Sequence, residues 1–158
     1  MNHDRSLATA ALKGAAAGVL GGMAMMAAMM MEEKALLPEG SNAKPPPMKV
    51  VAKGADVAGV QLSDSELKAA GMTAHLGYSA LWGALLGVSR EELPLSPGLQ
   101  GLLLAAVAYG VDFPSFGLLP QLGIERPPSQ QSMEKAAIAP PAHLLFGLTT
   151  AAAYELMN

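Results

Sequence analysis

The chain has 158 residues, of which 51% are apolar and 15% are charged, and its formal net charge is −3. Soluble domains usually carry about 25% charged residues, so this deficit indicates lipid surroundings. The chain has no cysteine, which excludes disulfides, thiolate metal ligands and a cysteine nucleophile. The charges are scattered and form no basic run, which argues against a nucleic-acid partner. The length suits a single domain.

Four apolar segments have the length of membrane-crossing helices, near the ~20 residues that span ~30 Å of hydrocarbon. The first covers residues 8–31, and its 18 uncharged residues from Gly14 to Met31 exceed the apolar core of a signal peptide. The others cover about 72–88, 97–119 and 136–157. These segments predict an all-α fold, a four-helix transmembrane bundle that forms one integral membrane domain over residues 1–158. The alternative is a soluble Ala-rich bundle, which would require charged helix faces that the first and third segments lack.

The connections between these segments differ in length. Residues 32–71 form an expected extramembrane loop, in which Ser63-Asp64-Ser65-Glu66 has capping-box spacing. This spacing predicts a short helix through residue 70 that Gly71 ends. Residues 89–96 are few and polar, so the second and third helices are expected to form a tight hairpin. The third connection, residues 120–135, contains two adjacent prolines that disfavour continuous helix.

Orientation follows from the Lys and Arg residues near the span ends. The side with both termini and the short connection holds Arg5, Lys13 and Arg90, whereas the two longer loops hold seven such residues. Basic residues favour the cytoplasmic side, so the longer loops are predicted to be cytoplasmic. The expected location is the bacterial inner (plasma) membrane, with the lipid bilayer as the partner.

Two stretches of the chain read alike and predict two tandem helical hairpins. The first contains, in order, Lys13-Gly14, Leu36-Leu37-Pro38, Pro45-Pro46-Pro47, Met48 and Ala74-His75-Leu76. The second contains, in the same order, Gln100-Gly101, Leu118-Leu119-Pro120, Pro127-Pro128, Met133 and Ala142-His143-Leu144. A tandem repeat of two membrane-crossing helices keeps its orientation, so the two histidines would enter the apolar layer from the same face.

Glycines at four-residue spacing mark the expected helix contacts. Gly14, Gly18 and Gly22 share one face of the first helix, and Gly83 with Gly87 repeats the spacing in the second. Helices associate in lipid through close backbone packing, so these five glycines predict contact surfaces inside the bundle or between subunits.

A candidate intramembrane polar site consists of His75, Asp112 and His143, each roughly 5–11 Å below the same membrane face by the helical rise. A carboxylate in hydrocarbon is unfavourable, so Asp112 is expected to pair with one of the histidines. Pro114 cannot donate to the carbonyl of Gly110, which predicts a kink in the third helix. These residues suit a proton relay, a metal site or a substrate cavity, or equally a structural cluster that fixes helix register.

Two cofactor variants of this site are open. In one, His75 and His143 ligate a haem iron from facing helices. In the other, methionine thioethers beside the histidines bind copper(I), although methionine-rich helix ends also serve as flexible packing; those methionines are Met23, Met25, Met26, Met29, Met30 and Met31. The sequence has no motif of the standard soluble enzymes, so it predicts no catalytic residue and no required cofactor, and any metal is unknown.

The second half of the chain resembles the YagU-like family of small bacterial inner-membrane proteins. The matching segments are Gln100-Gly101, Phe113-Pro114, Gly117-Leu118-Leu119-Pro120 and Ala142-His143, and they cover about a third of the chain. The first half, with its long Pro-rich loop, departs from the family pattern. The resemblance implies a multi-pass bacterial membrane protein with no established activity, so it transfers no catalytic role.

Two hypotheses about function follow. In the first, the chain is a non-enzymatic scaffold or accessory subunit that binds a protein partner, or a second copy, through its glycine faces and Pro-rich loop. In the second, it handles a proton, a metal or haem through His75, Asp112 and His143.

Overall fold

The computed structural model describes residues 2–37, 44–93 and 95–157. Within them, every regular element is helical, which confirms the all-α fold class. The elements are α1 (Asn2–Leu36), α2 (Pro46–Val57), α3 (Asp64–Glu92), α4 (Pro97–Asp112), α5 (Leu118–Gln121), the 3-10 helix η1 (Pro128–Gln130), α6 (Met133–Ala136) and α7 (Ala139–Leu156).

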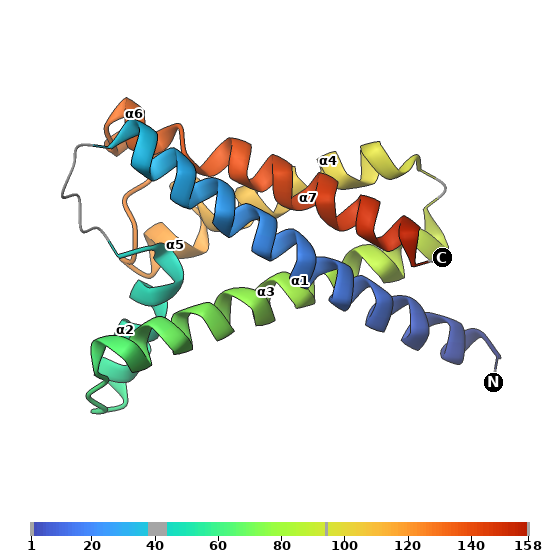
Figure 1. The fold of residues 1–158 in the computed structure, drawn as a ribbon, viewed down its shortest axis with the longest axis horizontal. Helices are drawn as coiled ribbons and strands as arrows, with labels where there is room; N and C mark the ends of the chain where they lie inside the picture. The colour runs from blue at the N-terminus through green and yellow to red at the C-terminus, as the bar shows by residue number, and fades with distance from the viewer. Residues whose placement is uncertain (1, 38–43, 94, 158) are drawn as a thin grey trace.

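The long helices α1, α3, α4 and α7 run between two ends of the molecule (Figure 1). One end, here called the terminal end, holds both termini and the turn between α3 and α4. The other, the loop end, holds α2, α5 and α6. Helix α1 packs along both α3 and α7, and α7 packs along α4, whereas α3 and α4 touch over a short stretch.

Helix α3 begins as the sequence predicts but ends much later. The capping box at Ser63 is present in both directions, because its hydroxyl accepts from the amide of Glu66 and its own amide donates to the Glu66 carboxylate. The predicted stop at Gly71 is wrong, because the helix continues to Glu92. Gly71 is instead a packing position: a Cβ there would lie 2.7 Å from Cγ of Met48 on α2. Much of the predicted loop 32–71 is therefore helical, while its residues 38–43, including Pro38 of the repeat, lie outside the described residues.

Helix α4 ends at Asp112, not near residue 119, so Pro114 ends the helix and does not kink it. The amide of Phe113 makes the last helical bond, to the Tyr109 carbonyl at 3.0 Å. Pro114 has no N–H with which to continue the ladder. The chain then folds back on the helix end, and a Cβ on Gly117 would lie 2.7 Å from the carbonyl oxygen of Asp112.

The predicted fourth helix is also divided. Helix α6 ends at Ala136, and α7 begins at Ala139 with two prolines in its first turn. Proline is tolerated there because the first amides of a helix have no intrahelical acceptor.

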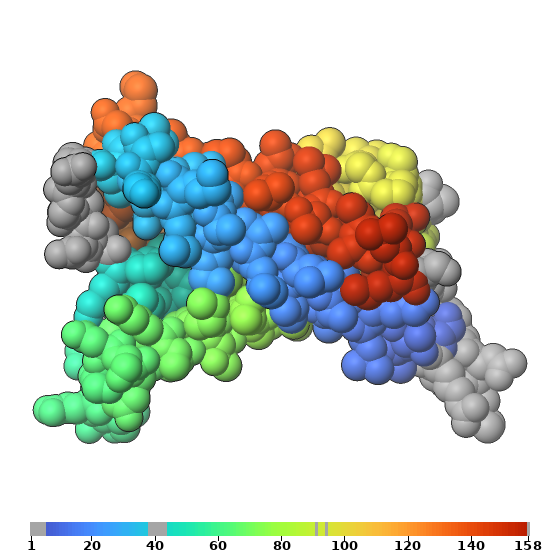
Figure 2. Space-filling model, in the orientation of Figure 1, coloured from blue at the N-terminus to red at the C-terminus, as the bar shows by residue number. Residues whose placement is uncertain are grey.

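Helices α1, α3 and α7 form much of the surface on the face seen in Figure 2, and the long helices expose many large apolar side chains. These include Leu12, Leu20, Leu81, Leu85, Leu102, Val107, Leu144 and Leu148. Two helical segments of the described chain, Ser6–Leu36 and Met133–Leu156, are long and apolar enough to cross a membrane by length and composition. Helices α3 and α4 do not meet the same criterion, and α4 has 16 residues.

Candidate functional site

The backbones of α1 and α3 touch where glycines face each other. A Cβ on Gly83 would lie 2.1 Å from the carbonyl oxygen of Gly14, and a Cβ on Gly18 would lie 2.2 Å from the carbonyl oxygen of Ser79. Side chains cannot occupy these positions without moving one helix. All five glycines singled out from the sequence lie at this contact: Gly14, Gly18, Gly22, Gly83 and Gly87.

A second close contact joins α4 and α7. A Cβ on Gly147 would lie 2.1 Å from the carbonyl oxygen of Gly101 and 2.9 Å from the amide nitrogen of Ala105. Sequence reasoning did not identify Gly147 as a packing residue. The repeat could have identified Gly147, because it follows His143 by four residues, as Ser79 follows His75 in the first stretch.

His75 connects α3 to α1. Its Nε2 lies 3.0 Å from the carbonyl oxygen of Gly22, and the side chain is half-buried. A carbonyl only accepts, so this nitrogen carries the proton and donates. His75 therefore makes an interhelical hydrogen bond to backbone.

His143 is buried in α7, with 4% of its surface exposed. Its Nδ1 donates to the carbonyl of Ala139 at 2.7 Å, one turn earlier in the same helix. The imidazole packs edge-on against the rings of Tyr109 and Phe113, with centroid separations of 5.4 Å and 5.3 Å. The ring thus fills the space between α7 and the end of α4.

Asp112 has a different partner from the one expected. Its Oδ1 accepts a hydrogen bond from the hydroxyl of Tyr78 at 3.0 Å, which connects α4 to α3. The expectation of a histidine partner is therefore wrong. The Tyr78 ring in turn meets Trp82 edge to face, with centroids 6.0 Å apart.

The three predicted site residues do not share a hydrogen-bonded cluster. His75 bonds to α1, His143 to its own helix and Asp112 to Tyr78. Within the described ranges, no three His, Asp or Glu side chains lie close enough to hold one metal ion. Sequence reasoning missed Tyr78, although it stands three residues after His75 and so on a neighbouring part of the same helix face.

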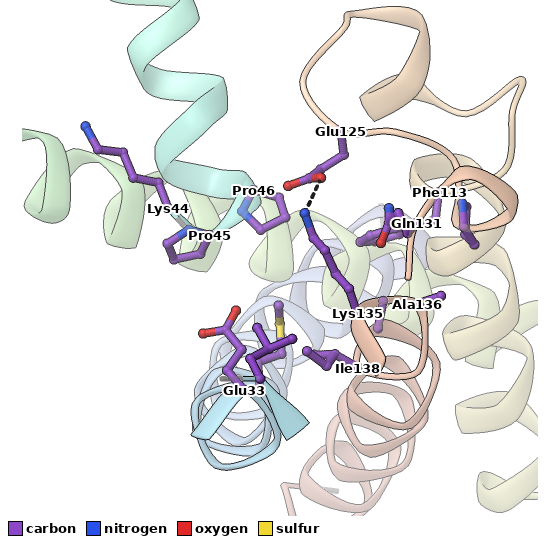
Figure 3. A pocket seen from close by; sticks show the side chains of 14 residues that line it. Glu33, Lys44, Pro45, Pro46, Phe113, Glu125, Gln131, Lys135, Ala136 and Ile138 are labelled. Atoms are coloured by element: carbon purple, nitrogen blue, oxygen red, sulfur yellow. Dashed lines mark hydrogen bonds and ion pairs between the residues drawn. The ribbon is translucent and has the colours of Figure 1, made fainter. Parts of the chain in front are cut away.

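A pocket at the loop end lies between the end of α1, the start of α2 and the segment around α6 (Figure 3). Beside it, the Glu125 side chain is 6% exposed and forms ion pairs with Lys49 of α2 and, at 3.0 Å, with Lys135 of α6. Glu33 of α1 lines the same pocket. The buried Glu125 carboxylate and the ammonium groups of its two lysines therefore link α2 and α6 to the segment after α5. Nothing in the sequence analysis identified this arrangement.

No protein-family model, curated protein or solved structure matches this chain. The resemblance to the YagU-like family stays a prediction.

Proposed function

We propose that the chain is a multi-pass protein of the bacterial inner membrane, made of two tandem helical hairpins, α1–α3 and α4–α7. Its function is that of a non-enzymatic scaffold or accessory subunit. The observation that carries the proposal is the set of exposed aliphatic side chains on all four long helices, for example Leu20, Leu81, Val107 and Leu148. A soluble bundle would place polar residues at such positions.

The distribution of polar groups supports the same proposal. At the terminal end, Arg90 donates to the side-chain oxygen of Gln100 at 2.9 Å and forms an ion pair with Glu155. At the loop end, Glu125 binds its two lysines. The ion pairs found among the described residues thus lie at the two ends, where a membrane protein meets water.

The tandem-hairpin arrangement is supported by contacts that recur at equivalent positions. Gly18 meets Ser79 in the first hairpin, and the equivalent residues Ala105 and Gly147 meet in the second. Gly18 stands four positions after Gly14, and Ala105 stands four positions after Gly101. The second residue of each pair stands four positions after the histidine of its stretch.

The histidine contacts recur in the same way. His75 bonds to the backbone of Gly22, and His143 packs on Tyr109. Gly22 stands eight positions after Gly14, and Tyr109 stands eight positions after Gly101. Each histidine therefore meets the same position of its partner helix, which a duplicated hairpin predicts.

The absence of cysteine permits a direct test with single-cysteine variants and a membrane-impermeant maleimide. Leu81→Cys, at an exposed position in the middle of α3, is expected to resist labelling in membranes and to react after denaturation. Glu92→Cys at the terminal end should react in intact spheroplasts, and Ser129→Cys at the loop end should react after permeabilisation. Labelling of Leu81→Cys as fast as Glu92→Cys, with release of the protein by alkaline carbonate, would show a soluble bundle and refute the proposal. Reversed labelling of the two end variants would overturn the orientation.

The second candidate function is the handling of a proton, a metal or haem. It is favoured by one observation, that the buried His143 packs on Phe113, the neighbour of Asp112. The iron, copper and zinc content of detergent-purified protein tests its metal forms. Near-stoichiometric metal that disappears in a His75→Ala/His143→Ala variant would favour this function, and its absence would favour the scaffold.

A further inference from the structure

The two hairpins meet along two seams that differ in closeness. In the seam between α1 and α7, a Cβ on Gly21 would lie 2.1 Å from Oγ1 of Thr150 and 2.8 Å from the carbonyl oxygen of Phe146. The counterpart of this seam in the tandem arrangement is the one between α4 and α3, where the helices touch over a short stretch. The bundle is therefore closed along one seam and more open along the other.

Larger side chains stand along the open seam. Counted from the histidine of each hairpin, Tyr78 is equivalent to Phe146, and Trp82 is equivalent to Thr150. An indole in place of a threonine side chain needs more room between the helices. The more open seam is thus the one whose equivalent positions carry the larger side chains.

The open seam also replaces an apolar pair by a polar one. Met25 and Phe146 belong to the same buried apolar cluster. Their equivalents are Asp112 and Tyr78, which are hydrogen-bonded at 3.0 Å. An apolar pair fills this position in the closed seam, so packing alone does not require a carboxylate in the open one.

The surroundings of Asp112 favour positive charge. No Lys, Arg or His of the described chain lies within ion-pair distance of its carboxylate. Asp112 is the last residue of α4, where the helix dipole is negative. Pro114 also leaves the carbonyl of Gly110 without its helical donor. A carboxylate in an apolar layer needs a partner, and no cationic side chain supplies one here.

We propose that the seam between α3 and α4 binds an organic cation, a protonated or quaternary amine. Asp112 supplies the counter-charge, and the rings of Tyr78 and Trp82 supply aromatic contacts that stabilise a cation even without N–H donors. The inference depends on the tandem hairpins of the proposed function, because the comparison of the two seams identifies the replaced residues.

Trp82 is the single tryptophan of the chain and lies at the proposed site, so its fluorescence reports binding. The probe is benzyltrimethylammonium, titrated into detergent-purified protein, and neopentylbenzene is its uncharged isostere. We expect a saturable change in emission with the cation and none with the isostere. Asp112→Asn should weaken binding at least about tenfold, the effect of losing one charge-assisted contact. Glu155→Gln, which removes one carboxylate charge at the terminal end, should leave the affinity unchanged.

Equal responses to the cation and its isostere would overturn the proposal, as would equal affinity in the wild type and Asp112→Asn. The comparison of the two probes on the wild type needs no variant, so it decides the matter even if Asp112→Asn does not fold. The titration uses solubilised protein and is independent of membrane insertion, which the Leu81→Cys labelling tests separately. A failure of this site is thereby distinguished from a failure of the proposed function.

Discussion

Replacing Gly83 by alanine tests whether backbone contact between α1 and α3 holds the first hairpin together. The added Cβ would lie 2.1 Å from the Gly14 carbonyl oxygen, where ordinary contact begins at 3.4 Å, a shortfall of 1.3 Å. It would also lie 2.6 Å from Cα of Gly18. Both neighbours are backbone atoms that cannot rotate away, so the helices must separate. Overpacking of this kind costs about 1–3 kcal/mol.

A matched control stands on the same helix, since a Cβ on Gly77 meets nothing within 4 Å. Alanine improves helix propensity at both positions by about 1 kcal/mol, so this gain cancels between the two variants. We expect Gly83→Ala to be less stable than Gly77→Ala by about 1–3 kcal/mol. Unfolding in detergent, followed by circular dichroism, measures the difference. Equal stability of the two variants would refute the close contact.

Three further predictions concern charged and histidine side chains. The pKa of Glu66 is lowered by a hydrogen bond from the side chain of the N-cap serine and by a second from its amide. The ionised Glu66 therefore stabilises the fold above its ordinary pKa of 4.5, and this stabilisation is lost as the pH falls through the lowered value. The difference in melting temperature between wild type and Glu66→Gln should accordingly shrink in acid. Glu125→Gln leaves two partly exposed lysines without their carboxylate and should destabilise the protein by about 1–3 kcal/mol. In the same denaturation assay, Glu134→Gln at an exposed position should change stability by less than about 0.5 kcal/mol. His143→Ala empties a buried site and should cost about 2–4 kcal/mol, more than the ~1 kcal/mol for the hydrogen bond lost in His75→Ala; equal losses would contradict the observed difference in burial.

The sequence predicted those parts of the fold that depend on local chemistry. The helical fold class follows from long apolar segments, and the start of α3 follows from a capping box whose bonds join residues three positions apart. The predicted helix end at Gly71 was wrong because the outcome there depends on a neighbour distant in sequence. The predicted continuation of the third helix beyond Pro114 was wrong because the proline ends the helix, where a kink was expected. Gly71 stays helical because Met48 packs on it. A glycine in the sequence does not by itself show whether it is a packing position within a helix or the residue that ends the helix.

The candidate site was predictable in its residue types but not in its partners. The spacing placed His75, Asp112 and His143 at similar depths, yet which side chain meets Asp112 depends on the rotation of α3 about its axis. That rotation brings Tyr78 to the carboxylate and sends His75 to α1. The Glu125 ion pairs were missed for a related reason, since Lys49 stands 76 residues away along the chain.

The glycine contact with α1 and the open seam with α4 involve two different faces of α3. On one face of α3, Ser79 and Gly83 stand four residues apart and bring its backbone against α1. On an adjacent face, Tyr78 and Trp82 have the same spacing: the Tyr78 hydroxyl donates to Asp112 of α4, and the Tyr78 ring meets the Trp82 ring. Because the first face permits little movement of α3, it also fixes how far the second face stands from α4. A site with its carboxylate on α4 and its aromatic groups on α3 needs that separation to be constant, since preorganised contacts lose less free energy on binding. The proposed cation site therefore depends on the close packing of α1 with α3 as well as on the side chains of the open seam.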